Sequence, residues 1–446
     1  MLITNIRLFD GTDDNLIEDA SVWVEDNIIR YAGPSGDIKN VPESIQNIDG
    51  NGLFVMPGMV ESHAHLSYAD NGPTELDKSP VEEAMIKTVN SARLMLGSGF
   101  TSAISFGSVH KIDVYLRDAI NNGQIPGPRL LAGGRDLGAT GSNADFHPDH
   151  FMPQTEGLGM ITDGPWAIRK AVRVLSKNKV DVVKVMLDGE LISFQGKPGD
   201  LGYTDEEVHA LVNEAHSRNM KVACHSRSAA AVKQAVIHGI DYIGHANYID
   251  DEALDLLKKN KDKLFVGPAI AWEIAFLENC VELGYSKDSK EVADYQAEVE
   301  ATIVSYKRMK EAGIRILVGG DYGLDITPHG TYAKDLEYYV NLFDFSNAEA
   351  LHSATRFGGQ AMKSDGSLGT LEEGRLADLV AVDGNPLEDI TVLQNHERII
   401  AVMKDGQFYK DLFTNNKPYH VRDDQLGLIL KPSSASRREK VKVVEG

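Results

Sequence analysis

The sequence predicts an α/β barrel joined to a smaller β domain, and three observations support this fold class. The chain has 446 residues, which is enough for a barrel of about 250 residues and a second, smaller unit. Between residues 58 and 321, strand-like and helix-like segments alternate, which is typical of a parallel α/β fold. Both ends of the chain instead show short strand-like segments separated by turns.

The first part of the chain, residues 2–48, predicts short strands. Apolar residues gather at residues 3–8, 20–24 and 28–32. Turn-forming Asp, Asn, Gly and Pro residues separate these segments. The pattern indicates a small β unit and not the first half of a βαβ repeat.

After Gly58 the pattern changes to strands that alternate with helices. We expect strands over residues 101–105, 128–132, 180–186, 221–225, 242–245, 264–267 and 315–321. We expect helices over residues 82–96, 114–122, 166–176, 204–218, 229–238 and 293–312. Thr204 with Glu207 fits a helix-starting capping box, and Gly239 fits a helix end. About eight strand–helix units result, as a parallel barrel requires.

One long segment, residues 133–165, fits neither element. It is rich in glycine and carries His147 and His150. We expect an irregular loop there, and a loop of this length inside a compact domain is often a lid or a binding loop.

The β pattern returns near the C-terminus. Residues 366–383 and 399–409 predict short strands that pair with the N-terminal unit. Residues 431–446 are polar and charged without a core pattern and predict a disordered tail. The expected organisation is a composite β domain (residues 1–57 with 366–430), a barrel (residues 58–365) and this tail.

Composition excludes several classes of function. The formal net charge is −21, which argues against partners such as nucleic acid or an anionic membrane surface. The only cysteines are Cys224 and Cys280, so a disulfide framework is not indicated and a cytoplasmic location is expected. The N-terminus lacks the features of a signal peptide, and no segment approaches the roughly 18 apolar residues of a membrane span.

Two histidines at a predicted strand end have metal-binding chemistry. His63 and His65 lie two residues apart, so in an extended strand both imidazoles point to the same side. Imidazole is a common ligand of zinc and similar divalent metals. Taken alone, the pair could equally be two unrelated histidines.

Four further residues stand at comparable places, where barrel enzymes position their chemistry. Lys184 lies within a run of valines, and because a buried ammonium is costly, it is either snorkelling, neutralised or chemically modified. His225, His245 and Asp321 each end a predicted strand. A divalent cation would remove the cost of burying Asp321 without a partner.

With these residues, the chain resembles the amidohydrolase superfamily. The resemblance is to its imidazolonepropionase-like and Xaa-Pro dipeptidase-like branch, which also includes hydrolases of xenobiotic amides, phenylureas and carbamates. It covers roughly residues 1–410. The motifs that carry it are His63-Ala64-His65, Val183-Lys184-Val185, Cys224-His225-Ser226, Gly244-His245-Ala246 and Gly319-Gly320-Asp321.

The resemblance implies a (β/α)8 TIM-like barrel and a β-sandwich-like domain built from both chain ends. It implies two divalent metal ions, zinc first, with Mn, Co or Fe as alternatives. His63, His65 and Asp321 would bind the more buried ion, and His225 and His245 would bind the second. A CO2-derived carbamate on Lys184 would bridge the two ions. Relatives are often homo-oligomers, which is expected here by analogy.

The implied activity is hydrolysis of an amide-type C–N bond by a metal-activated hydroxide, with Asp321 taking a proton from water and returning it to the leaving nitrogen. The small-molecule substrate would be an N-acyl amino acid, a dipeptide or an aryl amide. A phenylurea or carbamate of xenobiotic type is an alternative on the same site. A deaminase is a second alternative, against which Lys184 argues, and a non-catalytic scaffold is a third, against which the six filled ligand positions argue.

Four residues are candidates for substrate contact. Arg227 stands where dipeptidase-like relatives often carry a tyrosine, and it could bind a carbonyl or carboxylate, as a catalytic residue or a substrate-binding one, or face solvent. His329, Asn143 and His147 could line the pocket, although a loop histidine with a local role is the alternative. The segment around Asn143 departs from the family pattern Thr-Gly-Gly-His, so the substrate of the dipeptidases cannot be carried over. Trp272 favours an aromatic substrate group, whereas Arg227 favours a carboxylate.

Overall fold

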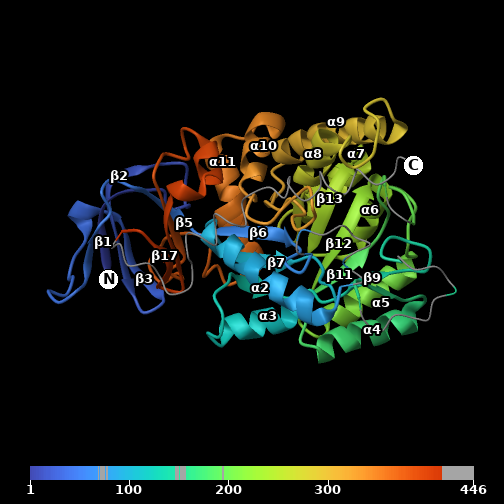
Figure 1. Cartoon of the computed structure of the whole chain (residues 1–446), viewed down its shortest axis with the longest axis horizontal. Helices are drawn as coiled ribbons and strands as arrows, with labels where there is room; N and C mark the ends of the chain where they lie inside the picture. Colours follow the sequence, from blue (N-terminus) through green and yellow to red (C-terminus); the bar gives the residue numbers. More distant parts are fainter. Residues whose placement is uncertain are drawn as a thin grey trace, which may run out of the picture.

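The computed structural model describes residues 1–68, 70, 76, 79–145, 150, 157–192 and 195–413. A small lobe, made of strands from both ends of the described chain, lies beside a larger lobe of helices and strands (Figure 1). The predicted tail, residues 431–446, and residues 414–430 of the expected β domain lie outside the described residues.

The small lobe contains one eight-stranded sheet. Its strand order is β17-β16-β15-β5-β1-β2-β3, with β4 paired to β1. β5 pairs antiparallel with β15, with Pro57 opposite Leu379, so the two ends of the chain share one sheet. The strands are β1 (Leu2–Leu8), β2 (Ile17–Glu25), β3 (Ile28–Pro34), β4 (Asn47–Asp49), β5 (Phe54–Pro57), β15 (Leu379–Val382), β16 (Ile399–Lys404) and β17 (Gln407–Asp411).

The larger lobe contains two sheets of parallel strands. One has the order β6-β7-β8 and the other β10-β9-β11-β12-β13-β14. The strands of the first are β6 (Met59–Ala64), β7 (Phe100–Ser105) and β8 (Arg129–Leu131). Those of the second are β9 (Asp136–Gly138), β10 (Gly159–Ile161), β11 (Val182–Met186), β12 (Lys221–Ser228), β13 (Tyr242–Tyr248) and β14 (Phe265–Gly267).

Backbone hydrogen bonds connect the two sheets of the larger lobe. The Ala132 carbonyl, next to β8, accepts from the N–H groups of Asp181 and Val182 at the start of β11. On the other side, the segment 314–322 lies between β14 and β6. It forms isolated parallel bridges from Ile316 to Val266 and from Tyr322 to Ala64.

The predicted strand over residues 315–321 is therefore wrong as a regular strand. The segment makes only single bridges, although Ser62 in β6 donates to the Val318 carbonyl. Gly319 and Gly320 follow, and Asp321 has a φ of 60°. The left-handed backbone at Asp321 departs from the extended conformation of a strand, and its carboxylate faces the interior cavity.

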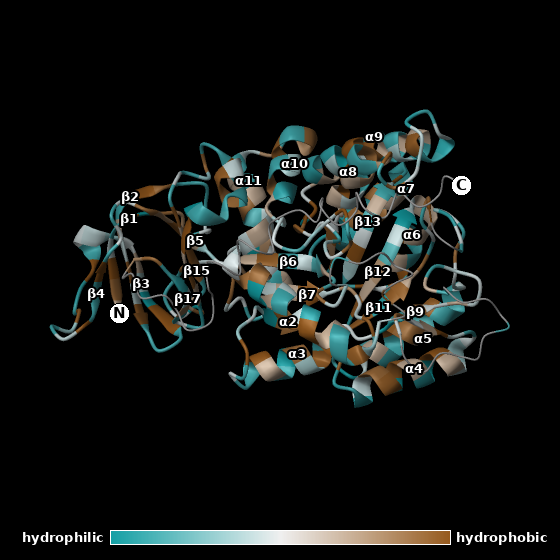
Figure 2. Cartoon of the chain, viewed as in Figure 1, coloured by the Kyte–Doolittle hydropathy of each residue, from teal (hydrophilic) through white to brown (hydrophobic). Residues whose placement is uncertain are grey.

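Helices cover the parallel strands, and their colour alternates between hydrophobic and hydrophilic along each helix (Figure 2). The predicted capping box of Thr204 and Glu207 is present at the start of α5, and Gly239 ends α6 with a φ of 82°. The α-helices are α2 (Val81–Gly97), α3 (Ile112–Asn121), α4 (Pro165–Lys177), α5 (Asp205–His216), α6 (Ala229–His238), α7 (Asp251–Asn260), α8 (Ile270–Asn279), α9 (Lys290–Glu311), α10 (Lys334–Phe343), α11 (Asn347–His352) and α12 (Gly358–Met362). Short 3-10 helices span Ser35–Asp37, Ile390–Gln394 and His396–Arg398, and a π-helical turn spans Ser353–Phe357.

The expectation of an irregular loop over residues 133–165 is wrong in part. β9 and β10 lie within this segment and pair in parallel, with Asp136 opposite Gly159. β9 also pairs with β11 through Leu137 and Val185. The backbone therefore has sheet partners there, which places Asp136 beside the strand that carries Lys184. Among the described residues, no helix is both long and apolar enough to cross a membrane.

Candidate metal centre

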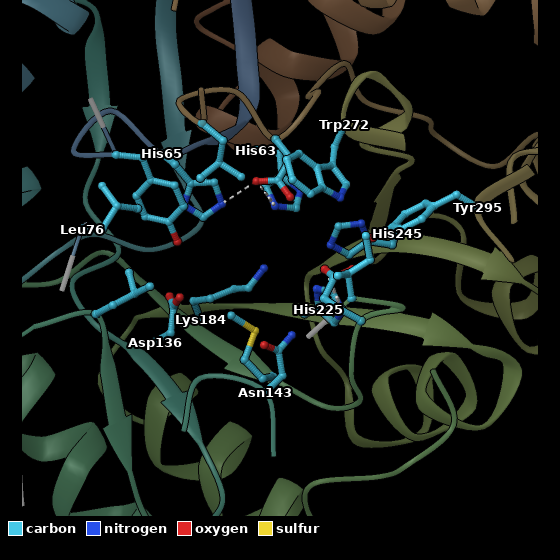
Figure 3. A pocket seen from close by; sticks show the side chains of 17 residues that line it. His63, His65, Leu76, Asp136, Asn143, Lys184, His225, His245, Trp272 and Tyr295 are labelled. Atoms are coloured by element: carbon cyan, nitrogen blue, oxygen red, sulfur yellow. Dashed lines mark ion pairs between the residues drawn. The ribbon is translucent and has the colours of Figure 1, made fainter. Parts of the chain in front are cut away.

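A cavity of about 140 Å³ lies among the C-terminal ends of the parallel strands. Histidine and carboxylate side chains line one part of it, together with Lys184 (Figure 3). Apolar side chains form another part of the wall, and they include Leu76, Leu158, Ile192, Trp272 and Leu324. The cavity therefore combines possible metal ligands with an apolar surface, as small-molecule sites often do.

The first group of possible ligands comprises His63, His65 and Asp321 and is called the β6 cluster below. The Asp321 Oδ1 atom lies 3.1 Å from His65 Nε2 and 3.8 Å from His63 Nε2. Ligands at 2.0–2.1 Å from one tetrahedral zinc ion are about 3.3 Å apart. The three predicted side chains therefore converge at the spacing of donors around a single ion.

The environment of the β6 cluster favours ligand chemistry. The Gly107 carbonyl lies 3.2 Å from His65 Nδ1, so a hydrogen on Nδ1 leaves the lone pair on Nε2. Burial lowers the pKa of His63 well below its usual value, which keeps the ring neutral. Burial opposes ionisation of Asp321, but the nearby imidazoles outweigh it and lower the pKa of this carboxyl group below its ordinary value. Asp321 has a left-handed φ of 60°, a conformation that aspartate adopts more readily than most residues with a side chain.

The second group comprises Glu190, His225 and His245 and is called the β12 cluster. Its ligand atoms lie within 4.8 Å of one another. Burial lowers the pKa of His225 to about 4 and that of His245 well below its usual value, so both rings are neutral near pH 7. The ring centres of His63 and His245 are 5.1 Å apart, so the two clusters adjoin each other.

Gly244 permits this close approach of the strands. A Cβ atom at this position would lie 2.7 Å from the Cys224 carbonyl oxygen and 3.3 Å from His63. A larger residue would therefore push β13 away from β12 and disturb both clusters. The predicted motif Gly244-His245 thus joins a ligand to the residue that makes room for it.

Lys184 lies on β11 with 1% of its surface exposed. Its Nζ atom is 4.6 Å from the centre of the Phe106 ring, and its side chain reaches into the cavity from the side opposite His63 and His65 (Figure 3). Burial lowers the pKa of its ammonium group, although Asp136 and Asp321 oppose this shift. A lowered pKa increases the share of neutral amine, which is the form that reacts with CO2.

Several buried imidazole nitrogens of the two clusters lack hydrogen-bond partners within the described part of the chain. Both ring nitrogens of His245 and the Nδ1 atom of His63 are buried, and no hydrogen-bond partner is found for them among the described residues. An unpaired polar atom in an apolar interior is costly unless it binds something. Buried imidazole nitrogens without hydrogen-bond partners in the described chain, beside carboxylates, therefore fit a divalent metal centre in both clusters.

Two pocket carboxylates were missed in the sequence. Asp136 is fully buried, and burial raises its pKa to about 7. Glu190 follows β11 in the chain and contributes to the β12 cluster. Asp136 lies within a glycine-rich segment that was expected to be irregular, and Glu190 lies four residues after the end of β11. No strand-end pattern therefore marked either of them. An acidic residue near a predicted lysine-bearing strand was the only available signal.

The expected substrate residues occupy different places. Asn143 lines the cavity. The buried His329 does not line it: its Nδ1 lies 2.8 Å from the Tyr332 hydroxyl, and its backbone N–H donates to Asp70. His147 lies outside the described residues.

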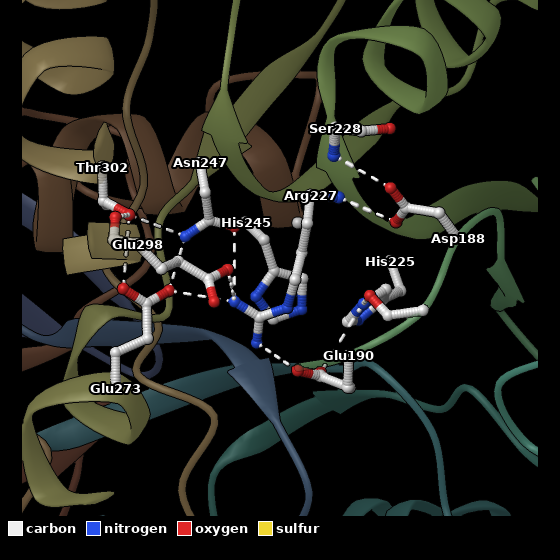
Figure 4. Close-up of polar contacts among 12 residues, drawn as sticks. Asp188, Glu190, His225, Arg227, Ser228, His245, Asn247, Glu273, Glu298 and Thr302 are labelled. Carbon is white, nitrogen blue, oxygen red and sulfur yellow. Dashed lines mark hydrogen bonds and ion pairs between the residues drawn. The ribbon is translucent and has the colours of Figure 1, made fainter. Parts of the chain in front are cut away.

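Arg227 does not line the cavity either. Its side chain is fully buried and meets three glutamates (Figure 4). This arrangement ties the guanidinium to carboxylates, and of these only Glu190 lines the cavity. The geometry therefore favours an indirect role for Arg227 over the direct substrate contact expected from the sequence.

Comparisons with known proteins identify the relatives of this chain. The amidohydrolase family model matches residues 54–409. Ochratoxinase from Aspergillus niger is 27% identical over 420 residues, covering 89% of this chain and 84% of that protein. Imidazolonepropionase from Caldanaerobacter subterraneus subsp. tengcongensis is 22% identical, covering 83% of this chain and 86% of that protein. A solved Xaa-Pro dipeptidase with bound methionine superposes with a TM-score of 0.79 at 30% identity, covering 92% of this chain and 99% of that one. The resemblance found in the sequence is confirmed.

Proposed function

Because the chain belongs to the amidohydrolase family, we propose that it binds two divalent metal ions at the β6 and β12 clusters and hydrolyses amides that carry an apolar or aromatic group. The chain is a hydrolase that acts on amide-type C–N bonds. One observation supports the proposal of two metal ions and an apolar or aromatic substrate. Two groups of imidazoles and carboxylates adjoin each other in a cavity that also has an apolar wall.

The chain's own residues have distinct tasks in this proposal. His63, His65 and Asp321 would hold the first ion, and His225 and His245 the second. Zinc, or Mn, Co or Fe in its place, would lower the pKa of a bound water and polarise the scissile carbonyl. Asp321 is ionised near pH 7, so its carboxylate can accept a proton from water and return it to the leaving nitrogen.

Lys184 is proposed to carry a CO2-derived carbamate. Its place among Asp136, Asp321 and both histidine clusters supports this modification, because a lysine cation would repel metal ions there. Loss of a proton from the ammonium, addition of CO2 to the amine, and loss of a second proton from the resulting carbamic acid would replace one positive charge with one negative charge. The resulting anion would stand between the two clusters as a shared ligand.

The apolar wall supports the choice of substrate class. Trp272, Leu324 and Leu158 line the cavity beside the ligand clusters. Burial of an apolar group against such residues contributes about 25 cal/mol for each Å² of surface. Arg227 is held by carboxylates, so it does not offer the carboxylate site that the sequence suggested. These observations favour an N-acyl amino acid, dipeptide or aryl amide with an apolar group at the wall, and a phenylurea or carbamate with an aryl group is the second candidate.

The proposal also covers the barrel, the division into domains, the cellular location and the oligomeric state. We propose that the two parallel sheets and the segment 314–322 form one (β/α)8 barrel, which the bridges from Ile316 and Tyr322 support. The division into a composite β domain (1–57 with 366–430) and a barrel (58–365) is supported by the sheet that both chain ends share. A cytoplasmic location is supported by the two free cysteines. A homo-oligomer is proposed by analogy alone.

A hydrolysis screen tests the proposed function. Metal-free protein is supplied with Zn, Mn or Co and bicarbonate, and then with aromatic N-acyl amino acids, Xaa-Pro dipeptides, anilides, phenylureas and carbamates. We expect cleavage of at least one amide or urea with an aryl group, at a rate that depends on added metal.

Two results would contradict the proposed function. Efficient ammonia release from nucleobases or guanidine-like compounds would support the deaminase alternative. Binding of fewer than one metal ion per chain, even with metal and bicarbonate in excess, would support the non-catalytic scaffold.

A further inference from the structure

Glu190 bridges a predicted metal ligand and a buried arginine. Its Oε1 atom lies 3.5 Å from His225 Nε2, and its Oε2 atom lies 2.7 Å from Arg227 Nη2. His225 and Arg227 are two residues apart on β12, so their side chains project to the same side of the strand. One carboxylate therefore spans both of them (Figure 4).

The orientation of the His225 ring follows from its neighbours. Its Nε2 atom lies 3.3 Å from the Gly189 carbonyl oxygen as well as near Glu190. A carbonyl and a carboxylate are both acceptors, so together they favour a hydrogen on Nε2. The lone pair then lies on Nδ1, the nitrogen on the other side of the ring.

Arg227 is anchored from several elements. Its Nη1 atom donates to Glu298 on α9 at 2.6 Å and to Glu273 on α8 at 3.0 Å. Asn247 on β13 also donates to Glu273, at 2.5 Å. Because Arg227 is completely buried, its guanidinium has few alternative positions, and it holds Glu190 at a fixed place.

The backbone that carries Glu190 is anchored to the same strand. The carboxylate of Asp188 accepts hydrogen bonds from the backbone N–H groups of Arg227 and Ser228, both at 2.9 Å. Its Oδ2 atom also accepts from the backbone N–H of Gly199, at 3.1 Å. The segment from Asp188 to Glu190 is thereby tied to the end of β12, close to His225.

Around Arg227, carboxyl groups outnumber the single positive charge. One guanidinium faces Glu190, Glu273 and Glu298. Burial raises the pKa of Glu273 and of Glu298, which lowers the cost of placing them together. Of the three, Glu190 alone lines the cavity, and its side chain is 22% exposed whereas that of Glu273 is completely buried.

We propose that Glu190 and Arg227 are positioning residues for the second metal ion: Arg227 holds the Glu190 carboxylate, and Glu190 holds His225 with its Nε2–H outward and its Nδ1 lone pair toward the metal. This inference rests on the proposed metal centre. It assigns Arg227 a role through His225, in place of contact with substrate. Carboxylates behind a metal-bound histidine typically change metal affinity by 10–100-fold.

The substitution Glu190→Gln tests the proposal because an amide has only one acceptor oxygen. The Arg227 guanidinium can only donate, so it takes that oxygen. The amide NH2 group then faces Nε2–H of His225, and two donors meet. We expect the ring to change tautomer or rotate, which weakens the second metal site about 10–100-fold and leaves the first site unchanged.

Metal binding is measured by equilibrium dialysis and elemental analysis, with bicarbonate present throughout. The tautomer of His225 in metal-free protein is measured by ¹⁵N NMR, with a His225→Asn sample to assign its signals. Glu190→Asp keeps two acceptor oxygens and is expected to retain the wild-type tautomer. Glu252→Gln is the matched control, because this exposed side chain on α7 pairs only with Lys233 among the described residues. Thermal unfolding confirms that each variant is folded.

The outcomes separate the possible roles. Loss of the second metal with an altered His225 tautomer supports the inference. Two metal ions bound as tightly as in the wild type would overturn it, as would loss of the second metal with an unchanged tautomer, which would make Glu190 a direct ligand. Failure of the wild-type protein to bind any metal would contradict the proposed function itself, so the two failures are distinguishable.

Discussion

The two ligand clusters contain similar side chains but are built differently. In the β6 cluster, the carboxylate of Asp321 lies directly against the histidines, at 3.1 and 3.8 Å. In the β12 cluster, the carboxylate of Glu190 is shared with a buried arginine. The first cluster is formed by residues at the end of β6 and in the segment 314–322, whereas the second also needs the segment after β11 and the helices α8 and α9.

This difference indicates which cluster is more sensitive to substitutions outside the cavity. Each cluster has one ligand in a left-handed conformation, Asp321 with a φ of 60° and His245 with a φ of 74°, so the backbone constrains both clusters. The β12 cluster also depends on side-chain contacts of Arg227 with Glu273 and Glu298. We therefore expect the first site to hold its ion more tightly and the second to respond more strongly to substitutions outside the cavity.

The largest effect is expected for Asp321→Asn, which removes the charge on which the β6 cluster converges. Loss of a general acid–base residue typically costs 10²–10⁴-fold in rate, and loss of a ligand adds to this. We expect kcat to fall by about 1000-fold or more, with loss of the first metal ion and retention of the second. His225→Asn should show the reverse order of metal loss. If either variant loses both ions together, the clusters are not independent.

A smaller but still large effect is expected for Lys184, which stands between the clusters. Lys184→Met removes the amine that a carbamate requires, and we expect activity to fall by about 100-fold, with both metal ions bound more weakly. Lys184→Arg should behave in the same way, because a guanidinium stays protonated. Metal-free wild-type protein should regain activity faster when bicarbonate accompanies the metal. Equal reactivation with and without bicarbonate would argue against the carbamate.

The sequence predicted the β6 cluster better than the β12 cluster. His63, His65 and Asp321 each follow a strand-like segment, so the rule that parallel strands end at one edge was sufficient to bring them together. The same rule identified His225 and His245. It could not identify Glu190, because its position depends on the turn after β11 and on contacts with Arg227.

For the fold, too, the sequence predicted some elements correctly and others only in part. Alternating segments located most helices and parallel strands, and the Thr204 capping box was confirmed. The regular strand over 315–321 and the irregular loop over 133–165 were not confirmed in full. In both cases long-range pairing decided the outcome: Ile316 bridges only to Val266, and β9 finds partners in β10 and β11. Local patterns do not contain that information.

The apolar wall of the cavity is expected to affect substrate binding, whereas the two ligand clusters affect metal binding. Trp272 lines the cavity, and burial of an aromatic side chain against substrate is worth about 1.5–3 kcal/mol. We expect Trp272→Ala to raise KM for aryl substrates about tenfold, with kcat and the metal content of both clusters little changed. Trp166→Ala is the control, because Trp166 is 81% exposed on α4. An equal loss for substrates without an aryl group would show that Trp272 supports the site in general.

The smallest effect is expected for Asp136, measured as stability of the metal-free protein. Burial raises the pKa of Asp136 from its ordinary 3.8 to about 7. The folded state therefore binds more protons than the unfolded state between these values, and the stability of the wild type falls as pH rises through this range. Asp136→Asn removes this dependence on pH. We therefore expect the free energy of unfolding of the variant, relative to that of the wild type, to be about 3 kcal/mol higher near pH 8 than near pH 5. This corresponds to a few degrees in Tm. Asp251→Asn is the control, because this side chain is 97% exposed, and it should show no such difference between the two pH values. An equal gain in the free energy of unfolding for Asp136→Asn at both pH values would mean that Asp136 is charged throughout and paired with Lys184.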